Sequence, residues 1–286
     1  MSAAWDYPDF DDHEGVHLYR DAASGLTAVI ALHSTKLGPA AGGTRFWHYA
    51  DKSDAITDAL RLSRGMSYKN AMADLPLGGG KAVILADAGR TKTPAMLQAF
   101  GRAVDSLGGH YVTAEDVGMS VADMVVIAQQ TRFVSGLPAV GAGVGGDPSP
   151  YTAMGIYLGI KAAVKRALGK DALKGVHVAV QGTGSVGGGL ARLLAGDGAL
   201  LTLADVNGAR AQALADELGA TCVATDGILS VEADVISPCA LGAVLNAQTI
   251  PMLKAPIVAG AANNQLATDE DGSRLHARGI LFAPDY

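Results

Sequence analysis

The chain has 286 residues, a length that fits about two domains better than one core. Its 22 basic and 28 acidic residues give a net charge of −6, which argues against a protein that binds the phosphate backbone of nucleic acids. Hydrophobic residues make up 49% of the chain and charged residues 17%, and this composition excludes wholesale disorder. The 37 glycines predict many sharp turns or places where the backbone approaches a ligand.

The cysteines and the N-terminal segment indicate a compartment. Cys222 and Cys239 lie far apart without a metal-binding spacing, so we expect two free thiols in a reducing compartment and no metal site. Residues 1–10 are acidic and lack a basic, apolar export signal. No apolar run approaches the roughly 20 residues that a membrane helix needs. The sequence predicts a cytoplasmic protein that contacts neither membrane nor nucleic acid.

Strand and helix patterns alternate through the first half of the chain. Residues 51–66 are predicted to be helical because their apolar residues recur at helical spacing and Asp51 suits a helix start. Thr93 followed by Pro94 opens a second helix in the usual order of cap and proline. The other expected elements are a helix over 120–130 and strands over 15–19, 26–33, 81–86 and 110–113.

Glycine and proline crowd residues 136–150, which predicts a loop or hinge between a domain of residues 1–145 and a domain of residues 146–286. The second half is expected to contain a helix over 151–168 and strands over 176–181, 200–204, 221–224, 235–238, 257–260 and 280–282. Repeated strand–helix alternation predicts an α/β fold, with a mostly parallel sheet covered by helices on both faces.

A glycine pattern in the second half is typical of a dinucleotide-binding turn. Gly182, Gly184 and Gly187 follow a predicted strand and precede a predicted helix, whose N-terminus favours phosphate. Asp205 ends the next strand, 23 residues after Gly182, and its carboxylate can bind both ribose hydroxyls and repel a 2′-phosphate. NAD is therefore predicted rather than NADP, although Arg210 nearby keeps NADP open. The residues expected at the nucleotide are Gly182, Thr183, Gly184, Ser185, Val186, Gly187, Asp205 and Val206.

Lys81 follows three glycines and begins an apolar run, so its side chain is not expected to be fully solvated. Burial lowers the pKa of a lysine, which suits a general base. The alternative is a lysine that extends its charged end from a strand terminus into solvent. Lys69, at the end of a predicted helix, and Asp116 stand in neighbouring compact motifs of the same half.

Six motifs in order carry a resemblance to a known family. They are GPAAGGTR, RGMSYKNAMADLPLGGGKAVI, TAEDVGMS, GDPSPYTA, SPCALGAVL and AGAANNQL. The chain resembles the amino-acid dehydrogenases, in particular the leucine, valine and phenylalanine dehydrogenases, which are related to glutamate dehydrogenase. The resemblance implies reversible, NAD-dependent oxidative deamination of an L-amino acid to its 2-oxo acid and ammonia. It also implies a homo-oligomer assembled through the first, substrate-binding domain, followed by a Rossmann-type NAD-binding domain.

The resemblance assigns roles to individual residues. Lys69 matches the lysine that holds the substrate carboxylate, and Lys81 matches the catalytic lysine that activates water and polarises the carbonyl. Asp116 matches the aspartate that exchanges protons with the amino group. Gly42 and Gly43 match glycines that line the carboxylate site.

Further residues are assigned to the cofactor and to the side-chain pocket. Asn263 matches an asparagine near the nicotinamide and the substrate amine, and Ala240 and Gly242 match a loop over the cofactor. The residues expected to line the side-chain pocket are small or apolar: Ala41, Met66, Gly78 and Ala114. They favour an aliphatic or aromatic substrate. Ala41 replaces a bulkier aliphatic residue of leucine-specific relatives, which favours larger side chains.

Two alternatives remain open at this point. A Rossmann oxidoreductase acting on hydroxy acids would need a histidine–acid pair near the nicotinamide, and the lysine pair argues against it. A catalytically weak or non-catalytic nucleotide-binding homologue is favoured by the end of the chain. Family members normally continue past the apolar run 280–282 with helices that wall the side-chain pocket, and this segment is expected to be missing here.

Overall fold

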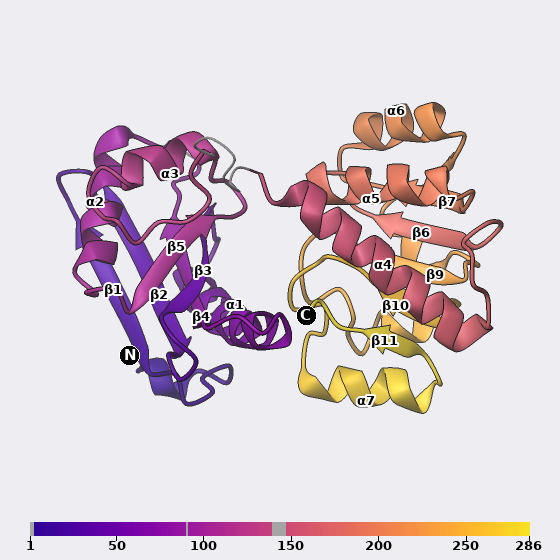
Figure 1. The fold of residues 1–286 in the computed structure, drawn as a ribbon, viewed down its shortest axis with the longest axis horizontal. Helices are drawn as coiled ribbons and strands as arrows, with labels where there is room; N and C mark the ends of the chain where they lie inside the picture. The colour runs from indigo at the N-terminus through magenta and orange to yellow at the C-terminus, as the bar shows by residue number, and fades with distance from the viewer. Residues whose placement is uncertain (1–2, 90, 139–146) are drawn as a thin grey trace. The chain divides into compact units, whose positions relative to one another are not determined.

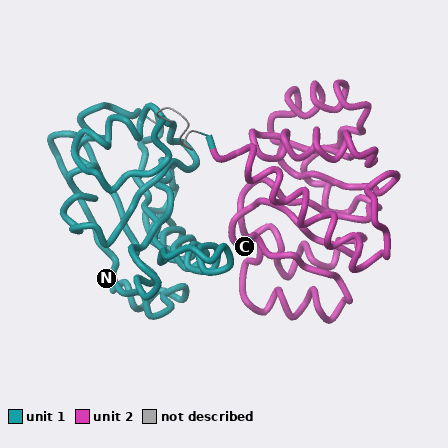
Figure 2. Tube along the Cα trace, viewed as in Figure 1, with its two compact units in different colours: residues 1–147, 286 teal, residues 148–285 magenta. Residues whose placement is uncertain are grey.

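The computed structural model describes residues 3–89, 91–138 and 147–286. The chain divides into two compact units, Met1–Asp147 with Tyr286 and Pro148–Asp285 (Figure 2). The predicted boundary at residue 145 and most of the predicted loop or hinge over 136–150 lie outside the described residues.

Unit 1 is built on a five-stranded sheet with the order β1-β2-β4-β3-β5 (Figure 1). The strands are β1 (Gly15–Asp21), β2 (Leu26–Ser34), β3 (Ala40–Trp47), β4 (Gly78–Leu85) and β5 (Tyr111–Glu115). β4, β3 and β5 are parallel, whereas β1 pairs antiparallel with β2 and β2 pairs antiparallel with β4. The expectation of a mostly parallel sheet is therefore wrong for one half of this sheet.

Strand β3 is not among the strands predicted from the sequence, and the reason lies in its glycines. Glycine weakens a strand that must stabilise itself through its side chains. Here β3 lies between β4 and β5, and a Cβ atom on Gly42 would lie 1.8 Å from the carbonyl oxygen of Gly80. The close approach of the β4 backbone thus requires glycine at position 42, although glycine has a low propensity for strands.

Helices cover both faces of this sheet. Helix α1 (Lys52–Met72) starts at Asp51, whose side chain accepts a hydrogen bond from the Ser53 amide, and extends past its predicted end at residue 66. Its buried Ala55, Ala59 and Leu60 pack on β2 and β4. Helices α2 (Pro94–Asp105) and α3 (Val121–Ile127) cover the opposite face, where Phe100, Met124 and Ile127 are fully buried.

Unit 2 contains a six-stranded, wholly parallel sheet with the order β11-β10-β9-β6-β7-β8. Its strands are β6 (His177–Gln181), β7 (Leu200–Ala204), β8 (Thr221–Cys222), β9 (Val235–Pro238), β10 (Ile257–Ala259) and β11 (Leu281–Ala283). Its helices are α4 (Ser149–Leu168), α5 (Ser185–Gly196), α6 (Gly208–Leu218) and α7 (Asp269–Ala277). Read in chain order, this is the strand order 3-2-1-4-5-6 of the dinucleotide-binding doubly wound fold.

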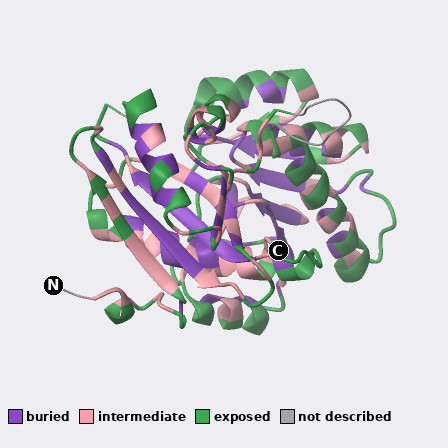
Figure 3. Ribbon diagram, turned by 60° about the vertical axis from the view of Figure 1, so that its left-hand side comes forward, coloured by how far each residue is buried: buried purple, intermediate pink, exposed green. Residues whose placement is uncertain are grey.

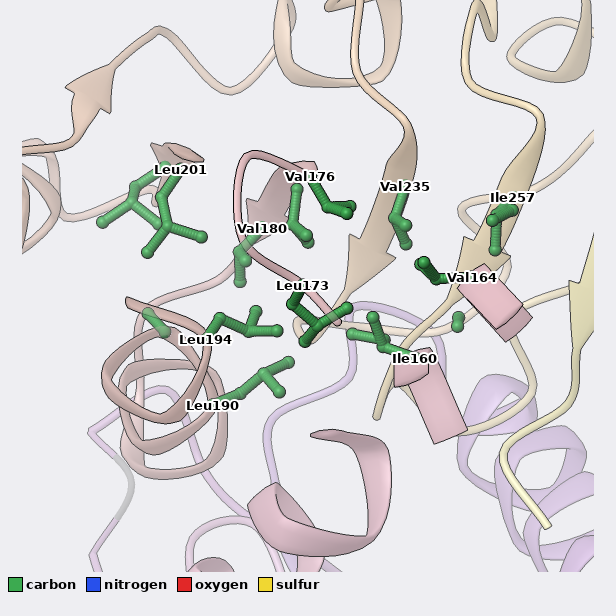
Figure 4. Packing of buried hydrophobic residues seen from close by; sticks show 14 of the residues in the cluster. Ile160, Val164, Leu173, Val176, Val180, Leu190, Leu194, Leu201, Val235 and Ile257 are labelled. Atoms are coloured by element: carbon green, nitrogen blue, oxygen red, sulfur yellow. The ribbon is translucent and has the colours of Figure 1, made fainter. Parts of the chain in front are cut away.

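One core of unit 2 lies between its sheet and helices α4, α5 and α6, and a second joins Leu275 of α7 to Ile236 and Val258 of the sheet. Leu190 and Leu194 of α5 and Ile160 of α4 meet Val180 and Val235 of the sheet (Figure 4). Burial of each such side chain stabilises the fold by roughly 1.5–3 kcal/mol. The central strands of both sheets are buried along most of their length, and the helices turn exposed residues outward (Figure 3). Across the described ranges, no helix combines the length and apolarity needed to cross a membrane.

Candidate active site

A buried ion pair lies on the α1 face of the sheet in unit 1. Lys81 alternates along β4 with Val83 and Leu85, which pack against α1, so its side chain points to the same face. Its Nζ lies 2.5 Å from Oδ2 of Asp116, which follows the end of β5. The two side chains are only 6% and 17% exposed. Topology thus joins a lysine and a carboxylate that are distant in sequence.

The environment shifts the pKa of both partners. Burial lowers the pKa of Lys81 below its ordinary value, and the nearby charges of Arg45 and Lys69 act in the same direction, against the attraction of Asp116. Burial alone would raise the pKa of Asp116, but the positive charges of Lys81 and Arg45 outweigh it and hold the pKa well below its usual range. Asp116 is therefore a carboxylate, and Lys81 releases its proton more readily than a solvated lysine.

A second cation reaches the same carboxylate. Arg45 of β3 places Nε 3.4 Å from Oδ2 of Asp116 and Nη1 2.7 Å from Oδ2 of Asp58 in α1. The Tyr49 hydroxyl donates to the same Asp58 oxygen at 2.5 Å. The sequence motif that contains Arg45 draws attention to the segment, but it assigns no role to Arg45, Asp58 or Tyr49. Only their arrangement in space identifies them as part of the site.

The other predicted substrate residues of unit 1 lie around this pair. Lys69 stands in the last turn of α1, near enough for its charge to act on Lys81. A Cβ on Gly42 would lie 3.0 Å from Cγ of Met66, so Met66 lies against that part of β3. A Cβ on Gly43 would lie 2.9 Å from Cβ of Asp116.

The predicted pocket residues occupy different positions. Ala41 is half-buried in β3, at alternate spacing with Gly43 and Arg45, which puts its side chain on the α1 face. Ala114 is half-buried in β5, opposite Gly43. Gly78 is buried, and a Cβ there would lie 1.9 Å from the carbonyl oxygen of Ser34, so backbone fills the space where its side chain would point.

The glycine turn of unit 2 links β6 to α5. Gly182 has φ +95°, a conformation open to glycine, and a Cβ there would lie 2.9 Å from the backbone of Cys239. A Cβ on Gly187 would lie 1.9 Å from the carbonyl oxygen of Gly182, so α5 packs tightly on the turn. A Cβ on Gly184 would meet no atom within 4 Å, which leaves the space before the helix N-terminus open. Ser185 and Val186 form the first turn of α5.

The carboxylate of Asp205 lies beside this turn. The Thr183 amide donates to its Oδ2 at 2.6 Å, and the Thr183 hydroxyl lies 3.1 Å from the same oxygen. Nη2 of Arg210 lies 2.8 Å from both carboxylate oxygens, so the arginine that keeps NADP open in the sequence pairs with Asp205. Val206, the next residue, is 95% exposed and joins no core contact.

The predicted loop residues at the carboxyl edge of this sheet meet one another. A Cβ on Gly182 would lie 3.0 Å from the amide nitrogen of Ala240, which follows β9. A Cβ on Gly242 would lie 2.4 Å from the carbonyl oxygen of Asn263. The glycine turn, the Ala240–Gly242 segment and Asn263 therefore converge at one edge. This edge, between β6 and β9, is where chain order reverses in the sheet and where such folds bind ligands.

These features of unit 2 define a dinucleotide-binding protein. The family model described as Glu/Leu/Phe/Val dehydrogenase, dimerisation domain, matches residues 14–133. Leucine dehydrogenase of Geobacillus stearothermophilus is 50% identical over 281 residues, which are 98% of this chain and 76% of that protein. Valine dehydrogenase of Streptomyces albus is 48% identical over 283 residues, 98% of this chain and 78% of that protein.

A solved structure agrees with these matches. The crystal structure of L-tryptophan dehydrogenase from Nostoc punctiforme aligns with a TM-score of 0.73 and 44% identity, over 96% of this chain and 78% of that chain. The chain belongs to the Glu/Leu/Phe/Val dehydrogenase family. The predicted family, α/β fold class and class of enzyme, an amino-acid dehydrogenase, are confirmed. Among the described residues, no group of three or more His, Cys, Asp or Glu side chains could hold a metal ion.

Proposed function

We propose that this protein catalyses the reversible, NAD-dependent oxidative deamination of an apolar L-amino acid. The buried contact between Lys81 and Asp116 carries the proposal. It brings together a base, Lys81, that can accept a proton and a carboxylate, Asp116, that can bind the substrate ammonium group. The balanced reaction is L-amino acid + NAD⁺ + H₂O → 2-oxo acid + NH₄⁺ + NADH + H⁺. The intact pair disfavours the alternative of a non-catalytic homologue.

The nucleotide-binding residues of unit 2 fit NAD. The open space at Gly184 allows a phosphate oxygen to approach the first amides of α5, and the tight contact at Gly187 keeps the helix close to the strand. Asp205 is the carboxylate for the ribose hydroxyls. Asn263 and the Ala240–Gly242 segment lie at the same edge of the sheet, where the nicotinamide end is expected.

The chain's own residues have distinct tasks in the reaction. When bound, NAD⁺ accepts the hydride from Cα of the amino acid. Lys69 pairs with the substrate carboxylate, and the Asp116 carboxylate accepts hydrogen bonds from the substrate ammonium. Lys81, whose pKa is lowered by burial, takes a proton from the water that adds to the iminium carbon. Gly42 and Gly43 allow the substrate carboxylate to approach the β3 backbone.

The substrate side chain is apolar because the residues assigned to its pocket carry no charge. Ala41 and Ala114 are small, half-buried residues of β3 and β5, and Met66 lies against Gly42. A substrate with a distal carboxylate would need a cation in this pocket. The relatives of highest identity reported above are named for leucine, valine and tryptophan, which are all apolar.

We also propose that the protein functions as a homo-oligomer in the cytoplasm. The matched family model describes residues 14–133 as a dimerisation domain. Within those residues, β1 is an edge strand of the sheet, and its Leu18 is 66% exposed. An edge strand with an exposed apolar residue can pair with a second copy. Native mass spectrometry that finds only monomer would contradict this assignment.

The decisive experiment follows NADH absorbance at alkaline pH with each of the twenty amino acids. Turnover of one or more apolar amino acids is expected. Lys81→Ala should keep the wild-type circular dichroism and lose activity by at least a thousandfold, since the general base is removed. Lys52→Ala, which changes an exposed lysine at the start of α1, is the matched control and should stay active. Full activity in Lys81→Ala would refute the role of Lys81.

A further inference from the structure

The guanidinium of Arg45 bridges two carboxylates in unit 1. Its side chain is 12% exposed and contacts Asp58 at 2.7 Å and Asp116 at 3.4 Å. Asp116 in turn contacts Lys81 at 2.5 Å. The four side chains therefore form a chain of alternating charge, Asp58–Arg45–Asp116–Lys81, which we call the charge chain.

The charge chain joins four parts of unit 1 through side chains, since its fourth member, Lys81, comes from β4. Asp58 comes from α1, Arg45 from β3, and Asp116 from the turn after β5, 71 residues away from Arg45. Its side chains are 6–23% exposed, so solvent screens their charges less than it screens surface pairs. A change in one charge is therefore felt along the whole chain.

The contact between Arg45 and Asp58 is shorter than the contact between Arg45 and Asp116. The Tyr49 hydroxyl also donates to Asp58. Asp58 thus fixes the guanidinium, and the guanidinium presents Nε to Asp116. Because one carboxylate is shared between Lys81 and Arg45, neither cation is fully neutralised by it.

We infer that Arg45, held by Asp58, is a positioning residue of the deamination reaction, which fixes the Asp116 carboxylate beside Lys81 and keeps Lys81 ready to release its proton. This inference rests on the proposed function and deepens it. Arg45 acts through Asp116 and Lys81, and no contact of Arg45 with the substrate is required.

The sign of each substitution follows from the charges. Removal of the Arg45 charge raises the pKa of Lys81, because Arg45 is one of the groups that lower it. Removal of the Asp58 charge acts in the opposite direction, since the guanidinium is then balanced by Asp116 alone. The titratable or charged groups on the elements packed around this site are His33 of β2, Arg45 of β3, Tyr49 before α1, Lys52, Asp54, Asp58, Arg61, Arg64, Tyr68 and Lys69 of α1, and Tyr111, Glu115 and Asp116 of β5 and its turn.

The test measures the pKa of Lys81 and the activity separately. The full-length protein carries ¹³C-labelled lysine, and the Lys81 signal, identified by its loss in Lys81→Ala, is titrated by NMR. In parallel, kcat/KM for oxidative deamination is measured from pH 7 to 11. Arg45→Gln should move both midpoints to higher pH by about one unit and so lower kcat/KM near pH 8 about tenfold. Asp58→Asn should move both midpoints to lower pH.

Controls separate this role from a merely structural one. Arg45→Lys, which keeps the charge, should have midpoints close to those of the wild type. Arg102→Gln removes an arginine that contacts Asp21 elsewhere in unit 1, and it should leave both midpoints unchanged. Shifts of the same sign in Arg45→Gln and Asp58→Asn, or no shift in either, would overturn the inference.

The two readouts keep the proposals apart. If Arg45→Gln does not fold, Asp58→Asn decides by the direction of its NMR shift. A wild-type protein that turns over no amino acid would refute the proposed function. In that case an unshifted Lys81 signal in Asp58→Asn still refutes the coupling along the charge chain, and opposite shifts support it.

Discussion

Gly43 and Asp116 occupy adjoining space: a Cβ atom on Gly43 would lie 2.9 Å from Cβ of Asp116 and 2.4 Å from the carbonyl oxygen of Glu115. No real Cβ contact is that short, so any side chain at position 43 must displace the turn that carries Asp116. The glycine is therefore needed for the position of the carboxylate as well as for access to the β3 backbone.

Gly43→Ala should lower kcat/KM by at least a hundredfold, because a displacement of about 1 Å in a catalytic group costs about that much. Stability should fall by about 1–3 kcal/mol from overpacking. Steady-state kinetics well below the melting temperature and thermal unfolding measure the two effects. Gly155→Ala, in α4, is the matched control, since its Cβ would meet no atom within 4 Å. Wild-type kcat/KM in Gly43→Ala would contradict this account of Asp116.

His13 should make unit 1 less stable in mild acid. It is 7% exposed, its Nε2 lies 3.0 Å from the carbonyl oxygen of Leu60, and its Nδ1 accepts a hydrogen bond from the Asp11 amide. Burial lowers the pKa of His13 from 6.5 to about 4. The unfolded chain therefore binds the proton first, and stability falls as the pH drops from 6.5 to 4, by at most about 3 kcal/mol.

Urea unfolding followed by tryptophan fluorescence measures this loss, because Trp5 and Trp47 both lie in unit 1. His13→Asn should be less stable at pH 7 but lose less stability between pH 7 and pH 5 than the wild type. His110→Asn, at an exposed position, should keep the wild-type pH dependence. Equal slopes for His13→Asn and the wild type would exclude His13 as the cause.

The sequence predicts unit 2 more closely than unit 1, and the reason is physical. The predicted strands 200–204 and 235–238 coincide with β7 and β9. Strands of a parallel sheet are buried on both faces, so they are visible in the sequence as short continuous apolar runs. Strand β3 is not predicted because it contains glycines, which are uncommon in strands. These glycines are needed because the backbones of β4 and β5 approach β3 closely, and that approach exists only in the folded sheet.

The sequence also predicts some residues of the candidate site and misses others. Lys81 stands out in the sequence because three glycines and an apolar run surround it. Arg45, Asp58 and Tyr49 carry no such local signal, since they stand singly in a strand, a helix and the connection between them. Their contacts depend on the register of β3 against β5 and on the packing of α1, which no short segment encodes.

Arg210 should weaken the preference of the enzyme for NAD. Its Nη2 contacts both oxygens of Asp205, a side chain only 4% exposed, and so offsets the negative charge that repels a 2′-phosphate. Arg210→Gln should raise the ratio of NADPH to NADH dissociation constants at least threefold, and Asp205→Asn should lower it about tenfold. Titration by cofactor fluorescence measures both. Arg192→Gln, which breaks an exposed pair with Glu217, should leave the ratio unchanged, whereas tighter NADPH binding in Arg210→Gln would refute this role.

The size of the substrate side chain should be controlled at Ala41. This residue is half-buried in β3, on the face that carries Arg45 and the α1 contacts, and its side chain is a single methyl group. The wild type should therefore prefer phenylalanine and tryptophan to leucine and valine. Ala41→Leu should narrow the substrate pocket and raise the kcat/KM ratio of leucine to tryptophan at least tenfold, about the effect of one or two methylene groups in an apolar pocket.

The comparison needs kcat/KM for all four amino acids, since KM alone does not report discrimination. Ala50→Leu, at an exposed position between β3 and α1, is the matched control and should leave the ratio as it is. A wild-type preference for leucine and valine over phenylalanine and tryptophan would show that Ala41 does not enlarge the substrate pocket. If Ala41→Leu lowers turnover of all four substrates equally, the added side chain disturbs the Lys81–Asp116 pair, and specificity must be set by other residues.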